Sequence, residues 1–314
     1  MKKNKDIPLH SFKNTVDNVQ SSQGKTLEPL DPEFPFVMTS FGAMNESAQA
    51  KYPHRHDCYE VLYICEGEGT HIIDFEPYPV KTNTFYFLSK DQVHFWQLSK
   101  PLKGYALLFT EEFLGIPSSN IIRTHDFSFF HDVGQAPYLS IDNKASAMVN
   151  GLFDGIEQEF RNETVRSLSV LRAYLHILLT QLHRLYDVDH PERHAKTTSP
   201  IVRHFSQLVS EHFISEHSVK DYANKIGIST SHLTDTIKAV TGQSPGNIIR
   251  QKLAVEAKRL LVQSNASIAE IGYHLNFEDS SYFGRFFKRE TGMSPAAFRQ
   301  EIREKYQIDS DKTP

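Results

Sequence analysis

The sequence has few cysteines and no long hydrophobic runs. Cys58 and Cys65 are its only cysteines, so a disulfide framework is not expected and a reducing compartment fits the composition. No stretch approaches the roughly 18 consecutive apolar residues that a membrane-spanning helix needs. The basic N-terminal segment is not followed by an apolar block, so no secretory signal is expected. We therefore expect a cytoplasmic protein with no membrane partner.

An excess of positive charge is also absent from the chain as a whole. The formal net charge is −4, whereas many nucleic-acid-binding proteins are strongly basic. The charge is unevenly distributed, because residues 201–305 contain 14 Lys or Arg and 11 Asp or Glu. That segment is +3 and the remainder is −7. The asymmetry is mild and allows a nucleic-acid-binding C-terminal part without requiring one.

The N-terminal part has the pattern of a β-domain. At 314 residues the chain is long enough for two domains. Over residues 31–140, short apolar or alternating runs are separated by turn residues, which is typical of a barrel or sandwich. A small closed barrel can hold one small ligand in its interior. Residues 1–30 are polar and lack apolar periodicity, so they are predicted to form a flexible arm.

Helical periodicity begins after the predicted barrel. Over residues 141–186, two apolar stripes predict two helices packed as a hairpin. Around Tyr174–Leu182 the second stripe is wider than one neighbouring helix can cover. The excess surface fits packing on the barrel of the same chain or homodimerisation equally well. Residues 187–200, polar and with two prolines, form the predicted linker to a C-terminal domain at 201–307, and 308–314 form a tail.

The C-terminal domain contains two copies of one helical repeat. The copies are Ser218–Pro245 and Ser267–Pro295, and both close on the motif Thr-Gly-x-Ser-Pro. In each copy a capping serine precedes a short helix, which ends in a turn at Gly227 or at Asn276. A second capped helix with a polar face follows the turn. This order of elements predicts two helix-turn-helix units.

The segment between the two copies predicts how they could act together. Pro245–Gln263 reads as one helix about 30 Å long. Two recognition helices held about one DNA turn apart (~34 Å) could enter successive major grooves and read two adjacent half-sites. The alternative is a helical domain whose repeated hairpin contacts other proteins. Matched caps, turns and terminators in both copies favour the DNA-binding interpretation.

Specific sequence runs in the second copy resemble a known family. Ile268–Phe277, Ser281–Lys288 and Thr291–Pro295, followed by Phe298 and Arg299, are similar to the DNA-binding domain of the AraC/XylS family of bacterial transcription regulators. The resemblance is close over the last third of the chain, and the barrel-plus-helices layout extends it. It implies a ligand-responsive regulator, an activator more than a repressor, that binds double-stranded promoter DNA. It further implies a small-molecule effector, a homodimer and RNA polymerase as a partner, with no enzymatic activity and no cofactor.

The resemblance also assigns candidate DNA-binding residues by position. They are Ser231, His232, Thr234, Asp235 and Lys238 in the first recognition helix, and Ser280, Ser281, Tyr282, Arg285 and Lys288 in the second. Arg285 suits a bidentate contact to guanine, and the two lysines suit phosphate. Asp235 stands where the family often has a basic or amide residue. It could accept from a cytosine amino group or repel wrong sites, so the first unit is predicted to be a weak or selective reader.

A histidine motif lies within the predicted barrel. His54–Gly67 has the spacing HxH, three residues, Glu, six residues, Gly, and resembles the first cupin motif, with His94 as the histidine of the second. Such histidines and a carboxylate could bind a transition metal. The second motif lacks the expected Pro and Gly, and the regulator family commonly keeps such residues without a metal. The resulting prediction is an effector site without metal, formed by His54, His56, Glu60, His94 and Trp96. The alternative is that these side chains only satisfy one another's hydrogen bonds inside the barrel.

These observations combine into one predicted architecture. The fold class is α+β multidomain, with an N-terminal cupin-like β-barrel and helical hairpin. An all-α domain of two helix-turn-helix units joined by a long helix follows. The alternative function is a metal-dependent cupin enzyme fused to a DNA-binding domain. In that case the three histidines and Glu60 would ligate iron or manganese.

Overall fold

The computed structural model describes residues 7, 9–12, 36–41, 53–115, 124, 127–130, 137–162, 167–189 and 199–306. Most of the predicted arm, residues 190–198 of the predicted linker and the tail at 308–314 lie outside these ranges. The chain divides into a sheet unit, Leu9–Asp189, and a helical unit made up chiefly of His190–Pro314. No helix in the described part is long and apolar enough to cross a membrane.

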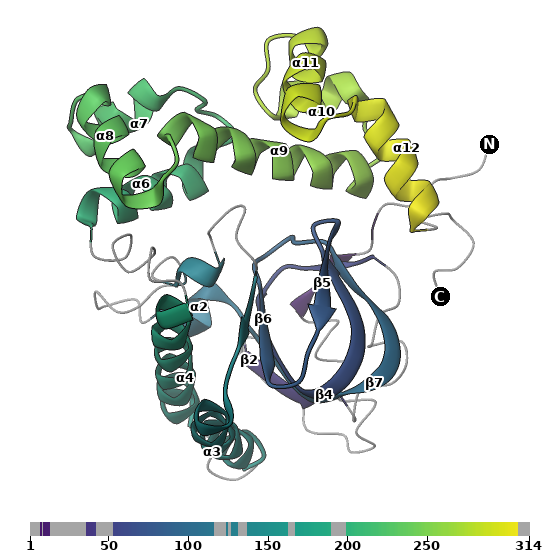
Figure 1. Cartoon of the computed structure of the whole chain (residues 1–314), viewed down its shortest axis with the longest axis vertical. Coiled ribbons are helices and arrows are strands. Elements are labelled where there is room, and N and C mark those ends of the chain that lie inside the picture. Colours follow the sequence, from purple (N-terminus) through teal and green to yellow (C-terminus); the bar gives the residue numbers. More distant parts are fainter. Residues whose placement is uncertain are drawn as a thin grey trace. The chain divides into compact units, whose positions relative to one another are not determined.

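The sheet unit is built on one curved antiparallel sheet of six strands (Figure 1). Their order is β2-β7-β4-β6-β8, and β5 pairs with β4. The bounds are β2 Phe36–Ser40, β4 Tyr59–Ile73, β5 Glu76–Val80, β6 Thr84–Leu88, β7 His94–Phe109 and β8 Tyr138–Ser140. A separate parallel pair joins β1 (Leu9–His10), which falls within the predicted arm, to β3 (Arg55–His56).

The curvature comes from the two longest strands. β4 and β7 pair from Tyr59 opposite Phe109 to Ile73 opposite His94, with register shifts in the middle of β4. Such irregularities bend a strand and increase its twist. At the bend, Gly104 has a φ of 143°, and a Cβ there would lie 1.9 Å from the carbonyl oxygen of Tyr63. Glycine is therefore required for the two strands to approach this closely. The sheet curves around a buried interior.

The helices of this unit cover one side of the sheet. They are α2 Glu111–Leu114, the 3-10 turn η2 Ser128–Phe130, α3 Asn143–Phe160 and α4 Leu168–Asp189. α3 and α4 pack against each other as the predicted hairpin, and their apolar stripes join the core of the sheet. The helical periodicity of the sequence also places Leu168 on the apolar stripe of the second helix, but its side chain is 42% exposed because it is the first residue of α4.

The helical unit consists of seven helices in its described part. They are α6 Pro200–His212, α7 Val219–Ile226, α8 Thr230–Thr241, α9 Pro245–Gln263, α10 Ile268–His274, α11 Ser280–Thr291 and α12 Pro295–Lys305. In Figure 1, α7 and α8 lie at one end of α9 and α10 and α11 at the other. The bounds of α9 are those expected from the sequence. Its Ile249, Leu253, Ala257 and Leu261 are buried, whereas Ile248 and Leu260 are half-buried.

Candidate nucleic-acid interface and histidine cluster

Local side-chain bonds fix the start of each helix in the two repeated units. The side chains of Ser218 and Ser229 accept hydrogen bonds from backbone N–H groups of the first turns of α7 and α8. Ser267 and Asp279 do the same for α10 and α11. These bonds satisfy N–H groups that have no partner within the helix. The four caps predicted from the sequence are therefore present.

The turns between the paired helices differ in residue but share a backbone conformation. Gly227 has a φ of 81° and Asn276 a φ of 59°, both in the left-handed region. Glycine adopts this region freely, and asparagine does so more readily than most other residues. The paired helices then meet at small residues, Ala223 in the first unit and Gly272 in the second, both buried. A Cβ on Gly272 would lie 3.2 Å from that of Phe283, so α10 and α11 are in close contact.

The candidate DNA-binding side chains lie on the outer face of the two recognition helices. On α8, Ser231, His232, Asp235 and Lys238 are exposed and Thr234 is half-buried. On α11, Ser281, Tyr282, Arg285 and Lys288 are exposed and Ser280 is half-buried. The opposite face of each helix is held in the core by Leu233 and Ile237, or by Phe283, Phe286 and Phe287. Each helix thus presents its polar face to solvent on a rigid support.

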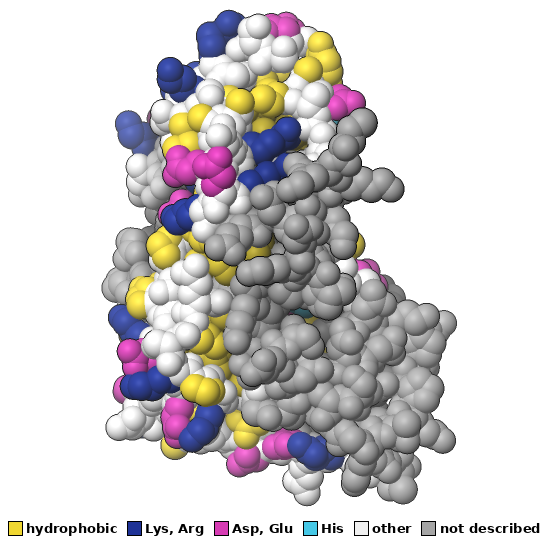
Figure 2. Space-filling view, turned by 90° about the vertical axis from the view of Figure 1, so that its right-hand side faces the viewer, with side chains coloured by type: hydrophobic (Ala, Val, Ile, Leu, Met, Phe, Trp, Pro, Cys, Tyr) yellow, Lys and Arg dark blue, Asp and Glu magenta, His cyan; other side chains and the backbone are white. Residues whose placement is uncertain are grey.

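Charged contacts distinguish the basic residues of α11 from one another. Arg289 is paired with Glu290 at 2.7 Å, and Arg250 of α9 approaches the same carboxylate at 3.5 Å. Among the described residues, neither Arg285 nor Lys288 forms an ion pair, and the guanidinium of Arg285 lies 5.9 Å from the ring centre of Tyr282. In the upper part of Figure 2, Lys and Arg side chains of the helical unit lie along its left edge and also near the centre of the visible face, beside hydrophobic and acidic side chains.

One residue of the family-like run has a structural role. Arg299 on α12 donates from Nε to the carbonyl oxygen of Leu261 at 2.8 Å and from Nη2 to that of Ala266 at 2.6 Å. Arg303 donates to the carbonyl oxygen of Ser264 at 2.9 Å. These carbonyls lie at and just beyond the end of α9, where C=O groups lack partners within the helix. The two arginines therefore cap α9 and fix its end to the second unit.

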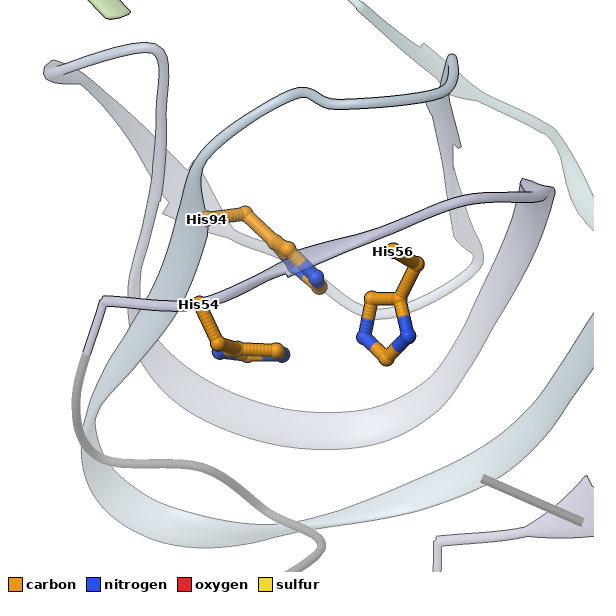
Figure 3. Close-up of side chains that lie close together, drawn as sticks. All are labelled: His54, His56 and His94. Carbon is orange, nitrogen blue, oxygen red and sulfur yellow. The ribbon is translucent and has the colours of Figure 1, made fainter. Parts of the chain in front are cut away.

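The predicted effector residues form one buried cluster in the sheet unit. His54, His56 and His94 are each less than 9% exposed, and their ligand nitrogens all lie within 4.8 Å of one another. Figure 3 shows the three rings turned toward a common region, with the rings of His54 and His94 4.2 Å apart at their centres. The carboxylate of Glu60 lies 3.3 Å from Nε2 of His56 and 3.7 Å from Nε2 of His94.

Burial favours the neutral forms of Glu60, His56 and His94. It raises the pKa of Glu60 to about 8, so the carboxyl group is protonated at neutral pH. It lowers the pKa of His56 and of His94 well below the usual value, and neighbouring histidines lower both further. The contact between His56 and Glu60 is therefore between neutral groups. A charged ligand would have to displace a proton or bring its own counter-charge.

Two further histidines border the cluster and were not among the predicted residues. His71 on β4 lies with its Nε2 3.1 Å from Nδ1 of His94, and its ring stacks on Trp96 at 3.6 Å. His10 on β1 lies with its ring centre 5.1 Å from that of His54. Knowledge of the strand register would have identified His71, because it lies directly opposite the predicted residue Trp96 in the β4–β7 pair. Trp96 itself is 4% exposed and packs among His71, Phe41 and Tyr86.

Comparison with known proteins yields matches in both units. Residues 222–301 match the model of a helix-turn-helix domain family, and residues 41–168 match that of the AraC-like ligand binding domain. The HTH-type transcriptional activator RhaS of Escherichia coli O157:H7 is 24% identical over 271 residues, which are 85% of this chain and 94% of RhaS. RhaS of Shigella flexneri is also 24% identical over 271 residues, with the same shares covered.

Solved structures also match. The structure of ToxT from Vibrio cholerae is 12% identical, with a TM-score of 0.42, over 85% of this chain and 98% of ToxT. The C-terminal domain of AraT from Geobacillus stearothermophilus is 27% identical, with a TM-score of 0.33, over 37% of this chain and 93% of that domain. With both domain matches in chain order, this protein belongs to the AraC family of transcriptional regulators, with an AraC-like ligand-binding domain followed by a helix-turn-helix domain.

Proposed function

We propose that this regulator is an activator that reads two adjacent DNA half-sites with α8 and α11. The observation that carries the proposal is the presence of two capped recognition helices at the two ends of α9, each with an exposed polar face. The curated relatives named as transcriptional activators support the direction of regulation. Activation requires a further contact to RNA polymerase, which we propose as a partner.

The readout is assigned to residues by chemistry. Arg285 presents a planar guanidinium that matches O6 and N7 of guanine, and the nearby Tyr282 ring can help hold it in place. Lys238 and Lys288 occupy matching positions in the two units and suit phosphate contacts. The smaller polar residues Ser231, His232, Thr234, Ser280 and Ser281 complete the two faces. Asp235 is proposed to select against bases that offer it no donor.

The test uses DNA that the protein itself selects. The full chain enriches a duplex from a random-sequence library, here called the selected duplex, and its dissociation constant is measured by fluorescence anisotropy. Inserting five base pairs between the half-sites turns one major groove to the opposite side of the DNA. We expect this insertion to weaken binding by about tenfold or more, because the second unit can no longer engage. Equal binding to both duplexes would contradict reading by two helices.

The histidine cluster is proposed as the effector site. His54, His56, Glu60 and His94 converge in the buried interior, and Trp96 borders them through His71. An effector that binds one conformation of the regulator more tightly than another shifts the population toward the conformation it prefers, and so changes DNA binding. Burial of Glu60, His56 and His94 in their neutral forms favours an uncharged polar effector, such as a polyol. The test is calorimetric titration of sugars and organic acids into the wild type and His56→Ala, with loss of binding in the variant expected.

The proposed dimer uses the exposed face of α4. Val170, Ile177 and Val188 are 40%, 47% and 77% exposed, and their spacing of 7 and 11 residues places them on one side of the helix. Two copies of this stripe would cover each other. We expect Ile177→Asp to convert a dimer into a monomer in sedimentation velocity. Ser169→Asp, on another exposed side of α4, is the matched control and should leave the dimer intact.

A bound divalent metal ion is the second candidate for the same cluster. Nε2 of His94 is buried and has no hydrogen-bond partner among the described residues, while Nδ1 on the same ring is held by His71. A hydrogen-bond partner on the other ring nitrogen commonly orients a metal-binding histidine. The donor set therefore fits a transition metal, with His54, His56, His94 and Glu60 as ligands. A bound metal would supply a positive charge that polarises a ligand oxygen.

Elemental analysis separates the metal-free effector site from the metal site. Protein purified without chelator is measured for zinc, iron, manganese and copper. We propose a regulator without enzymatic activity, so we expect substoichiometric metal and no change of DNA binding after chelation. Stoichiometric metal that is lost in His56→Ala would instead favour the metal site. Only in that case would the alternative of a metal-dependent enzyme need assays of turnover.

A further inference from the structure

The connection between α6 and α7 contacts both helix-turn-helix units. On the side of the first unit, the hydroxyl of Tyr222 donates to the carbonyl oxygen of Glu216 at 2.8 Å. Lys225 forms an ion pair with the carboxylate of the same residue at 3.0 Å. Both partners are on α7, and Tyr222 is fully buried. Residues 213–218 are therefore fixed to the first unit by both backbone and side-chain contacts.

The same connection also reaches the turn of the second unit. The side-chain amide of Asn276 donates from Nδ2 to the carbonyl oxygen of Ser215 at 2.8 Å, across 61 residues of sequence. The ring of His217 lies 5.2 Å from that of Phe277. Phe277 is 5% exposed and packs on Tyr282, Phe283 and Phe286 of α11. The contact thus extends to the base of the second recognition helix.

The equivalent position in the first unit shows that this contact is not a requirement of the turn. Gly227 occupies the same left-handed position as Asn276, and a Cβ built on it would meet no atom within 4 Å. Glycine is sufficient for the backbone there, so the amide of Asn276 has a separate use. Its hydrogen bond to Ser215 links the turn of the second unit to residues 213–218, which are fixed to the first unit.

We propose that residues 213–218 and Asn276 form a second link between the two units, beside α9, and that this link sets the half-site spacing that the chain accepts. The inference rests on the proposed reading of two half-sites by α8 and α11. A single helix between two rigid bodies leaves bending and twisting about its axis, whereas a second attachment away from the axis restricts both. Preorganisation of this kind lowers the entropic cost of engaging both half-sites.

The variants for the test keep the backbone and remove the link. Asn276→Gly retains the left-handed conformation and removes the amide. Asn276→Asp keeps the size of the side chain but cannot donate to the carbonyl of Ser215. Gly227→Asn places the same residue type in the matching turn of the first unit, where the space is open, and serves as the control.

The first measurement is made without DNA. Spin labels are placed at Ala239→Cys on α8 and Ser281→Cys on α11, both exposed, in a background with Cys58→Ala and Cys65→Ala. Electron–electron resonance gives the distribution of label distances. We expect both Asn276 variants to broaden the distribution while Gly227→Asn leaves it unchanged. Equal widths in all proteins would overturn the second link.

The second measurement uses the selected duplex and versions with one base pair inserted or removed between the half-sites. We expect the Asn276 variants, without labels, to bind the selected duplex about three- to tenfold more weakly. Their penalty for altered spacing should be smaller than that of the wild type. An unchanged spacing penalty would overturn the role in spacing. If the wild type ignores spacing altogether, the two-half-site proposal fails, while the distance measurement still tests the link.

Discussion

The two helix-turn-helix units share a scaffold but differ in what fills it and what it presents. Both have capped helices, a left-handed turn and a small residue at the helix contact. The core of the first contains the aliphatic Leu233 and Ile237 and one aromatic residue, Tyr222, whereas the core of the second contains four phenylalanines. Those four are Phe277, Phe283, Phe286 and Phe287. α8 carries one acidic and one basic residue, while α11 carries three basic residues and one acidic residue.

This difference separates the requirements of the fold from those of DNA binding. The caps and turns are set by backbone geometry, so both copies keep them. The faces and cores carry no such constraint and have diverged. The unit with the more aromatic core also presents the more positive helix, so we expect it to supply most of the binding free energy. The first unit then adds selectivity through Asp235.

The largest effect is expected from truncating a buried side chain in the core of the second unit. Phe286 is 4% exposed and packs on Phe277 at 5.0 Å, whereas the matching Thr236 in the first unit is half-buried. We expect Phe286→Ala to lower the free energy of unfolding of the helical unit by about 3–5 kcal/mol. Thr236→Ala, the matched control, should change it by less than about 1 kcal/mol.

Urea unfolding followed by far-UV circular dichroism measures this difference. The only tryptophan, Trp96, lies in the sheet unit, so its fluorescence reports whether that unit is unaffected. Similar losses in the two variants would contradict the assigned difference between the cores.

The next effect compares the two residues at the centre of the recognition faces. Arg285→Ala should weaken binding to the selected duplex by about 10- to 100-fold, because a bidentate contact to guanine is lost. Asp235→Ala should change affinity by less than about threefold, since removing a negative charge near phosphates offsets a lost base contact. Anisotropy on duplexes with single base changes measures both. A larger loss from Asp235→Ala would reverse the proposed ranking of the units.

Smaller effects, equal in the two units, are expected from replacing the lysines at matching positions of α8 and α11. Lys238 and Lys288 occupy equivalent exposed positions on α8 and α11. If each contacts one phosphate, replacement by alanine lowers the slope of log affinity against log salt by about 1. The slopes are measured for the selected duplex between low and physiological salt. Loss of slope in Lys288→Ala alone would mean that α8 does not approach the DNA backbone.

Local features of this fold could be predicted from the sequence. Caps, turns and the bounds of α9 depend on residues a few positions apart, and their expected positions agree with the structure. The spacing of the cupin-like motif likewise located His54, His56 and Glu60, which the structure places beside His94. In each case the chemistry of a short stretch is enough to define the geometry.

Contacts between distant segments could not be predicted in the same way. His71 reaches His94 through the register of β4 and β7, and His10 reaches the cluster through the short β1–β3 pair. The bond from Asn276 to Ser215 spans 61 residues and leaves no periodic signal. Arg299 belongs to the family-like run, yet only the fold shows that it caps α9. Such contacts depend on how elements pack, which residue patterns do not specify.

The smallest expected effect concerns the start of α10, where the second unit has a reciprocal cap. Ser267 accepts from the backbone of Glu270, and Glu270 accepts from the backbone N–H of Ser267 at 2.7 Å. Hydrogen bonds from the side chain of Ser267 and from its backbone N–H lower the pKa of the Glu270 carboxyl group below its usual value. The folded state therefore favours the carboxylate over the protonated form. The cap stabilises the folded protein fully above the ordinary glutamate pKa of about 4.3, and this stabilisation is lost as the pH falls through the lowered pKa of the folded state.

Glu270→Ala should therefore lower the melting temperature of the helical unit slightly at pH 7, and the difference from the wild type should vanish in acid. Glu270→Gln is the matched control, because glutamine can complete the same cap without titrating. Its stability relative to alanine should not depend on pH over this window. Thermal unfolding followed by circular dichroism between pH 3.5 and pH 7 measures all three proteins. A difference between wild type and Glu270→Ala that persists unchanged at the acid end would show that helix propensity, and not the reciprocal cap, separates them.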